Sequence, residues 1–327
     1  MSMDRRKFIS RSGLAGAASL LPLGALGRSN ITPGGHRPWR ETSPETGPVF
    51  SGNPPSGSRK FKLGLQLFTV NDDMNRDPLG TLKAVQAMGY EDFEIYGFDP
   101  EPVTYYGLEA ARLRSSLDTL GLTVSSGHYG FSTFFDAPED RMRWFTDRCI
   151  QGALALGSPY ITWPWLAPDY RTPENYRKLA GMLNRIGEQV KGAGLGFAYH
   201  NHGFEFEAAG EVTPYELLLR ETDPELVKLQ MDLYWVVHAG RTTPQQLVSE
   251  HPGRFVMWHI KDMDTRTRDY TELGNGSIHY PNILPDPDAS GLEYYYIEQG
   301  GNFASSPLES VAASAAYFKE HVQGYFE

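Results

Sequence analysis

The stretch RFVMWHIKD at residues 254–262 alternates between two sets of side chains. Successive side chains of a strand point to opposite faces, so Val256, Trp258 and Ile260 would share one face. The other face ends in His259 and Lys261. Three further runs have the same character, namely GLGFAYHNHGFEF (194–206), LVKLQMDLYW (226–235) and LEYYYIEQ (292–299). Each run therefore predicts a strand with polar residues near its carboxyl end.

Four polar side chains fall at matching depth in these runs: His200, Asp232, His259 and Glu298. In a closed parallel barrel one face packs on helices and the other fills the interior, which tolerates polar residues at its open end. Any one of them alone would be read as a hydrogen-bonded buried residue. Together they predict a site for one divalent metal ion. Two imidazoles and two carboxylates suit manganese, zinc, cobalt or iron(II); magnesium suits them less, and calcium prefers oxygen-only shells.

The same unit recurs from Lys60 onward: an apolar run, a loop and a helix-length amphipathic segment. Strands are expected at 62–70, 92–97, 122–130, 160–165, 195–202, 227–235, 255–263 and 293–299. Helices are expected to begin near residues 77, 108, 138, 173, 214, 244 and 307, with one helical turn near Asn282. Such a series, without a phosphate-binding glycine loop, predicts an α/β fold, the (β/α)8 TIM barrel, with its site at the carboxyl face.

Composition narrows the choice of partners. The formal net charge is −10, and no basic cluster occurs beyond the amino terminus. This balance argues against nucleic acid and favours a small, neutral or weakly charged substrate. Cys149 is the single cysteine, which excludes an internal disulfide and a thiolate metal site, and its surroundings predict a buried apolar role. The sequence does not determine whether the chain forms a homo-oligomer.

The amino terminus resembles a twin-arginine export signal. Residues 3–27 read MDRRKFISRSGLAGAASLLPLGALG, with Arg5 and Arg6 ahead of a short apolar run. The run is short for a membrane span and ends in Ala25 and Gly27, which suit signal peptidase; an uncleaved anchor is the alternative. We therefore expect export by the twin-arginine translocase, a periplasmic mature protein and no stable membrane contact after cleavage.

Three segments follow from these patterns. They are a signal peptide at 1–27, a flexible linker at 28–59 rich in Pro, Gly and Ser, and a barrel domain at 60–327.

Seven segments of the barrel domain, LGLQLFTV, GYEDFEIYG, YHNHGFEF, MDLYWVVHAG, WHIKD, LGNGSIHYPNIL and YYYIEQ, carry a family resemblance. In this order they resemble the sugar phosphate isomerase/epimerase family, the xylose isomerase-like TIM barrels. The resemblance implies one divalent metal held after strands five to eight, often by Glu, Asp, His and Glu. In this chain, the corresponding positions are His200, Asp232, His259 and Glu298. Many members carry Glu-Asn-His where this chain has His200-Asn201-His202, so one of the two glutamates that exchange protons in the epimerases is missing.

Three residues are candidates for the chemistry. Glu298, His202 or Lys261 could remove a proton beside a ketone, and the ammonium of Lys261 could stabilise an enediolate. His202 shares the face of His200 and could also support the metal or contact substrate. A structural ion pair of Lys261 with Asp232 or Glu205 is the alternative.

Other side chains near strand ends are candidates for substrate binding. The resemblance implies that Glu94 touches substrate, and His128 could bind a hydroxyl group or shuttle a proton. Trp163 and Trp235, with Trp165 and Tyr234, could stack on a sugar ring, whereas Trp258 is expected to pack on helices.

These features favour a metal-dependent carbohydrate isomerase or epimerase that works through an enediolate. Because His200 breaks the two-carboxylate symmetry, a lyase or hydratase acting on an oxidised sugar such as a 3-keto-glycoside is a second hypothesis. An exported sugar-binding barrel without catalytic activity is a third. Phosphodiester cleavage, known for barrels of this fold, conflicts with the acidic balance.

Overall fold

The computed structural model describes residues 60–208 and 212–327. The expected export signal (1–27) and linker (28–59) lie outside the described residues and stay predictions. Within the described ranges, no helix combines the length and the apolar character needed to cross a membrane.

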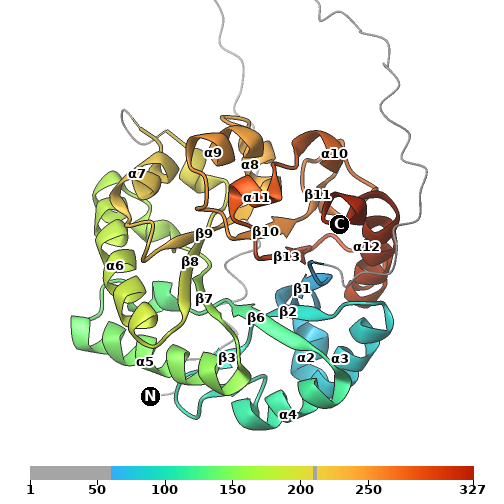
Figure 1. Cartoon of the computed structure of the whole chain (residues 1–327), viewed down its shortest axis with the longest axis horizontal. Helices are drawn as coiled ribbons and strands as arrows, with labels where there is room; N and C mark the ends of the chain where they lie inside the picture. Colours follow the sequence, from blue (N-terminus) through green and yellow to red (C-terminus); the bar gives the residue numbers. More distant parts are fainter. Residues whose placement is uncertain (1–59, 209–211) are drawn as a thin grey trace, which may run out of the picture. The chain divides into compact units, whose positions relative to one another are not determined.

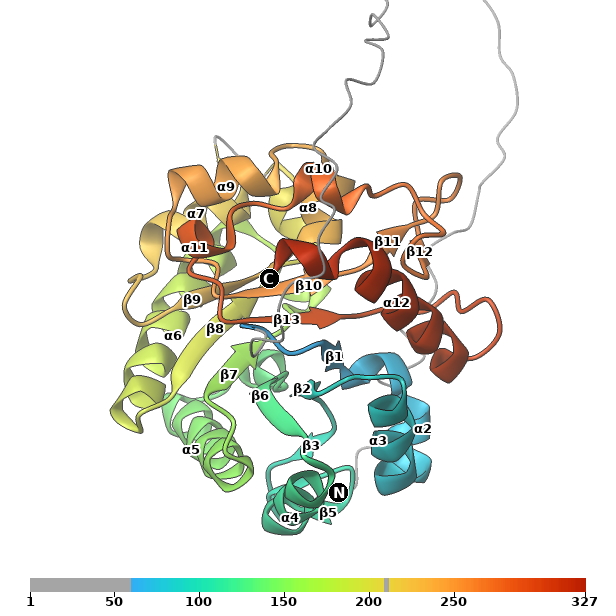
Figure 2. The same cartoon turned by 45° about the vertical axis from the view of Figure 1, so that its right-hand side comes forward.

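Eight parallel strands form the central sheet (Figures 1 and 2). They are β1 (Gly64–Gln66), β2 (Asp92–Ile95), β6 (Thr123–Gly127), β7 (Tyr160–Trp163), β8 (Gly196–His200), β9 (Lys228–Asp232), β10 (Met257–Ile260) and β13 (Tyr294–Ile297). Except for β6 and β7, consecutive members of this series pair with each other, and β13 pairs with β1. An isolated parallel bridge from His128 to Thr162 joins the ends of β6 and β7. The sheet is thus the predicted (β/α)8 barrel, nearly closed, and the carboxyl ends of its strands meet at one mouth.

Helices in the connections cover the outside of the barrel (Figure 1). They are α2 (Asn71–Arg76), α3 (Pro78–Ala87), α4 (Ala110–Leu120), α5 (Glu139–Leu156), α6 (Pro173–Gly192), α7 (Pro214–Glu221), α8 (Leu233–Ala239), α9 (Pro244–Glu250), α10 (Tyr280–Ile283), α11 (Pro287–Ser290) and α12 (Pro307–His321). Short 3-10 turns are η1 (Leu67–Val70), η2 (Phe131–Phe134), η3 (Pro168–Tyr170), η4 (Phe204–Phe206) and η5 (Gln323–Tyr325). Thr172, Thr213 and Thr243 cap α6, α7 and α9 ahead of a proline, as the Thr-Pro pairs predict.

Two expected strands end earlier than the sequence suggests. Residues Leu67–Val70 form η1, because the Gln66 side chain accepts a hydrogen bond from the Phe68 amide at 3.0 Å. Residues Leu233–Ala239 form α8, because Asp232 caps that helix by accepting from the Trp235 amide at 3.2 Å. A side chain at the strand end turns the backbone into a helix in both cases.

Two small antiparallel sheets were not expected from the sequence. β3 (Phe98–Asp99), β4 (Thr104–Tyr105) and β5 (Leu108–Glu109) form the first, after β2. β11 (Asp262–Met263) and β12 (Tyr270–Thr271) form the second, after β10. Both follow the carboxyl ends of barrel strands, so they add walls to the mouth.

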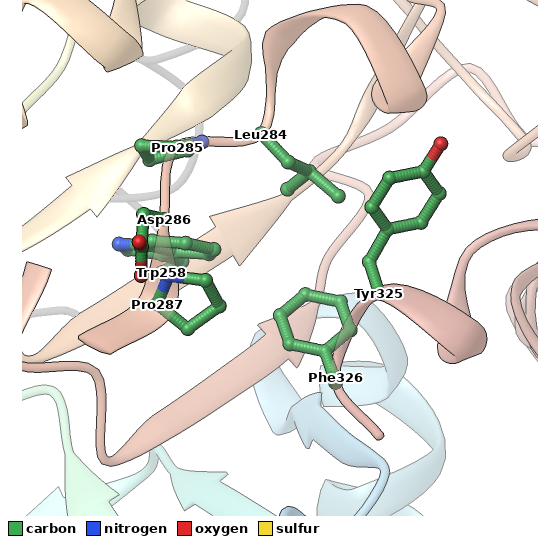
Figure 3. A pocket seen from close by; sticks show the side chains of 7 residues that line it. All are labelled: Trp258, Leu284, Pro285, Asp286, Pro287, Tyr325 and Phe326. Atoms are coloured by element: carbon green, nitrogen blue, oxygen red, sulfur yellow. The ribbon is translucent and has the colours of Figure 1, made fainter. Parts of the chain in front are cut away.

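Alternation along β10 separates the barrel interior from the layer beneath the helices. Trp258 faces the helices, as expected, and its Nε1 donates to Ser290 Oγ at 3.0 Å. Trp258 also lines a hollow of about 290 Å³ together with the α10–α11 connection and the last residues of the chain (Figure 3). Its lining comprises Leu284, Pro285, Asp286, Pro287, Tyr325 and Phe326. Because Trp258 points away from the interior, this hollow is separate from the barrel mouth.

Candidate active site

The four predicted metal ligands are all buried at the mouth of the barrel. His200, Asp232 and His259 lie at or next to the carboxyl ends of β8, β9 and β10. The exposed fractions of their surfaces are 1%, 0% and 0%. Glu298 follows β13 directly and is 8% exposed. Alternation along four separate strands therefore places these side chains in one region of the interior.

Three of these residues come close enough to share one ion. Asp232, His259 and Glu298 each offer a ligand atom, and the three atoms lie within 4.8 Å of one another. Their chemistry, one imidazole nitrogen and two carboxylate oxygens, matches a borderline divalent cation. The buried Oδ2 of Asp232 faces the Lys261 ammonium at 2.7 Å and His200 Nε2 at 3.7 Å, and it is an anionic oxygen of the kind that binds divalent cations. The residues present thus fit a divalent metal.

His200 approaches this group from the side. Its Nε2 lies 3.7 Å from Asp232 Oδ2, and it forms a second candidate group with His128 and His259. The Nδ1 of His200 lies 2.9 Å from Gln230 Oε1, which accepts a hydrogen bond and leaves the lone pair on Nε2. Ligation by His200 as a fourth member remains a prediction.

Lys261 bridges the two carboxylates of the three-residue group. Its Nζ lies 2.7 Å from Asp232 Oδ2 and 2.7 Å from Glu298 Oε2. The sequence left open an ion pair with Asp232 or with Glu205. The structure shows the pair with Asp232, whereas Glu205 accepts hydrogen bonds from the Tyr199 hydroxyl and the His202 amide.

Glu94 lies beneath the mouth rather than on its surface. It is fully buried, and its carboxylate lies 2.6 Å from His259 Nε2 and 2.9 Å from His128 Nε2. It also accepts hydrogen bonds from Gln66, Ser126 and Gln230. Because His259 Nδ1 lies 2.6 Å from Glu298, the imidazole is held between two carboxylates.

Gln230 is the central residue that the sequence did not reveal. Its Nε2 donates to Glu94 at 2.6 Å, and its Oε1 accepts from both His128 and His200. An uncharged amide carries no signature of catalysis in a sequence. The signal that could have found it is alternation, since Gln230 is two residues before Asp232 on the same face of β9.

The charges in this cluster stabilise one another. Burial lowers the pKa of His259, but the negative charges of Glu94 and Glu298 have the larger effect and raise it to about 9. Burial raises the pKa of Glu298, yet Lys261 and His259 bring it well below its usual range. Burial likewise disfavours the charged form of Lys261, but Asp232 and Glu298 raise its pKa above the ordinary value. The lysine therefore remains an ammonium ion.

His202 lies beside this cluster with one free nitrogen. Its Nδ1 is buried and has no hydrogen-bond partner among the described residues. Its ring stacks on Phe204 and lies 4.9 Å from the His200 ring, centroid to centroid. Burial and then the charge of Lys261 hold the pKa of His202 well below its usual range, so the imidazole is neutral. A neutral, unpartnered nitrogen can accept a proton.

The aromatic candidates separate into two groups. Trp235 lies at the mouth, with its ring 5.8 Å from that of His202, and its indole nitrogen has no partner among the described residues. Trp163 is not brought to the site: it is fully buried and stacks on Phe131 beneath the helices. Thr162 is the interior residue of β7, so the parity of that strand directs Trp163 outward.

The connection after β10 is anchored to the site by Asp262. Its buried carboxylate accepts hydrogen bonds from the backbone amides of Met263, Gly274, Gly276 and Ile278. A side chain at Gly276 would place its Cβ 2.1 Å from Asp262 Oδ1. The Tyr280 hydroxyl accepts from the Lys261 amide at 2.9 Å and donates to the Lys261 carbonyl. Hydrogen bonds thus connect this loop to the backbone of Lys261.

Known proteins share this architecture. Residues 82–321 match the Xylose isomerase-like TIM barrel family, so the chain belongs to that family. It is similar to the inosose dehydratase of Bacillus licheniformis, with 25% identity over 293 residues, 77% of this chain and 92% of that protein. The chain spans about half the length of several other inosose dehydratases that it matches.

Solved structures place it in the same group. A sugar phosphate isomerase/epimerase from Parabacteroides distasonis is similar with a TM-score of 0.70 and 25% identity, over 82% of this chain and 97% of that one. The IOLI protein, whose structure holds a zinc atom, has a TM-score of 0.63 and 15% identity, over 81% and 99% of the two chains.

We expect the metal-free protein to lose stability as the pH rises from about 6.5 to about 9. The pKa of His259 is raised to about 9 in the folded state. Protonated His259 therefore contributes its full stabilisation of the fold below pH 6.5, near its unfolded pKa, and this stabilisation is lost as the pH rises to about 9. His200 and His202, whose pKa values are lowered, affect stability only below this window. Urea unfolding in EDTA across this pH range measures the effect. A His259→Gln variant with the same slope would contradict the assignment.

Proposed function

We propose that the protein is a divalent-metal-dependent lyase that eliminates or adds a group beside the ketone of an oxidised cyclic sugar, such as a 3-keto-glycoside. The convergence of Asp232, His259 and Glu298 at the barrel mouth carries the proposal. The dehydration in the name of the related inosose dehydratase supports an elimination. Isomerisation or epimerisation of a free ketose is the competing reaction.

The proton on the carbon beside the ketone goes to His202. Its Nδ1 is neutral, buried and unpartnered among the described residues. When the C–H bond breaks, its electron pair forms the C=C bond of an enediolate and the charge moves onto the ketone oxygen. The C=O bond then re-forms, the electron pair shifts to the new C=C bond, and the C–O bond breaks with its pair on the leaving oxygen. The imidazolium formed at His202 can return this proton to the departing oxygen. One residue can therefore serve both halves of an elimination.

Lys261 stabilises negative charge on the substrate oxygen. Its ammonium lies 2.7 Å from two carboxylates that keep it protonated, so the proton-abstracting role considered for Lys261 does not fit. Glu298 is bound to Lys261 and His259, which makes it a ligand and counter-ion rather than a free base. A fixed positive charge next to a developing enediolate lowers the barrier to its formation.

A divalent ion held by Asp232, His259 and Glu298 would polarise the ketone and an adjacent hydroxyl oxygen and make the neighbouring C–H bond more acidic. His200 is the candidate fourth ligand, and its Gln230 hydrogen bond orients the nitrogen toward Asp232. Gln230 and Glu94 hold the histidines in place from below. The chain itself supplies the orientation and the proton transfer.

Turnover of defined substrates tests the proposal. Protein purified without added metal is assayed for metal content, reloaded with manganese, zinc or cobalt, and incubated with 3-keto-glycosides and with free ketohexoses. We expect consumption of the 3-keto-glycoside with release of its leaving group, and uptake of deuterium at the adjacent carbon in heavy water. Rapid epimerisation of the ketohexoses without turnover of the oxidised glycosides would overturn the proposal in favour of an epimerase.

A further inference from the structure

Phe68 is exposed at the mouth of the barrel, where most aromatic residues are covered. Among the described residues, the large hydrophobic side chains with high exposure are Phe68, Leu154 and Tyr325, and Phe68 is 40% exposed. Leu154 belongs to α5 and Tyr325 to η5. Phe68 belongs to η1, directly after β1, and therefore lies at the carboxyl end of the barrel strands.

Its ring is fixed by a neighbour from the next strand. Tyr96 follows β2, and the two ring centroids lie 5.1 Å apart with an interplanar angle of 71°. Tyr106 packs close behind at Gly97, where a Cβ atom would lie 2.7 Å from the Tyr106 ring. Tyr106 itself has a φ of 50°, a left-handed conformation that costs a non-glycine residue about 1 kcal/mol. Phe68 and Tyr96 together form an aromatic surface beside the carboxyl ends of β1 and β2.

This surface is linked to the candidate active site by one side chain. The amide of Gln66 accepts from the Phe68 backbone at 3.0 Å and donates to Glu94 at 2.6 Å. Glu94 in turn contacts His259 at 2.6 Å. Phe68 and Tyr96 come two residues after Gln66 and Glu94, respectively, so the aromatic pair lies next to the site, farther out along the same two chain segments.

We propose that Phe68 and Tyr96 form a second subsite, which holds the ring on the leaving-group side of a glycoside while the oxidised sugar occupies the metal-binding group. The inference rests on the proposed function and adds the substrate class, a glycoside with a ring-shaped aglycone. Aromatic faces attract the apolar face of a sugar or an aryl ring. Asp72, an exposed carboxylate in the first turn of α2, disfavours a phosphorylated aglycone.

Substitution of Phe68 separates this subsite from the reaction. We expect Phe68→Ala to lower kcat/KM for an oxidised phenyl glucoside or disaccharide, relative to the oxidised methyl glucoside, by about 3- to 10-fold, the loss of one aromatic contact. Phe68→Trp should restore the ratio. Leu154→Ala, another exposed apolar residue but on α5, is the matched control and should leave the ratio unchanged. Comparing the phenyl glucoside with the disaccharide tells an aryl aglycone from a second sugar.

Binding without turnover distinguishes the two proposals. Calorimetric titration with unoxidised phenyl and methyl glucosides measures the subsite even if the protein has another reaction. Weaker binding of the phenyl glucoside to Phe68→Ala would support the subsite whatever the chemistry. Equal effects of Phe68→Ala on phenyl and methyl substrates, in turnover and in binding, would overturn it. Thermal unfolding of each variant verifies that the fold is retained.

Discussion

Glu298→Gln is expected to lower kcat/KM by about 1000-fold and to reduce the bound metal. The carboxylate lies 2.6 Å from His259 Nδ1 and 2.7 Å from Lys261 Nζ, and it belongs to the three-residue group. An amide of the same shape removes a negative charge from a buried site, so a divalent cation loses part of its attraction. Steady-state kinetics and metal analysis of the purified variant measure both effects.

Glu293→Gln is the matched control for this variant. Glu293 is an exposed carboxylate directly before β13, and it accepts a hydrogen bond from Tyr160 at 2.8 Å. It should keep its activity and metal content, since the change lies at the opposite end of the strand. A Glu298→Gln protein with full activity and full metal content would remove Glu298 from the proposed site.

Glu94→Ala is expected to lower the free energy of unfolding by about 3–5 kcal/mol, the cost of breaking a buried ion pair by deleting one partner. The fully buried carboxylate compensates His259, and several donors lose their acceptor at once. Urea unfolding at neutral pH measures the loss. Glu101→Ala, an exposed residue, should stay within about 0.5 kcal/mol of wild type. A loss below about 1 kcal/mol for Glu94→Ala would contradict the prediction that this buried carboxylate stabilises the fold.

Much of the barrel was predictable because its strands and helices carry local signals. Period-two alternation marks β10, and a capping threonine ahead of proline marks α6, α7 and α9. The start of α8 was missed, because Leu233, Tyr234 and Trp235 favour strands and the decisive signal is the side chain of Asp232 acting as a cap. At this position, the hydrogen bond from the Trp235 amide to Asp232 favours a helix over the strand that the residue types suggest.

The convergence of three side chains at the mouth was predictable because charge and alternation coincide there. Asp232, His259 and Glu298 combine a titratable group with a position at a strand end. Gln66 and Gln230 have the position without the charge, and only contacts between distant strands reveal their role. Trp163 shows the converse error. Tyr160–Trp163 has no charged residue to mark its interior face, so sequence alone could not tell which way the indole points.

The anchoring of residues 274–278 by Asp262 limits how this enzyme can be adapted to new substrates. Three amides of this loop donate to one carboxylate, Gly276 has no room for a side chain, and Tyr280 binds the backbone of Lys261. Substitutions or loop grafting there would disturb the backbone of Lys261 together with the wall of the mouth. Diversification should therefore concentrate on the β1 and β2 side, where Phe68 can be exchanged while the lysine keeps its position.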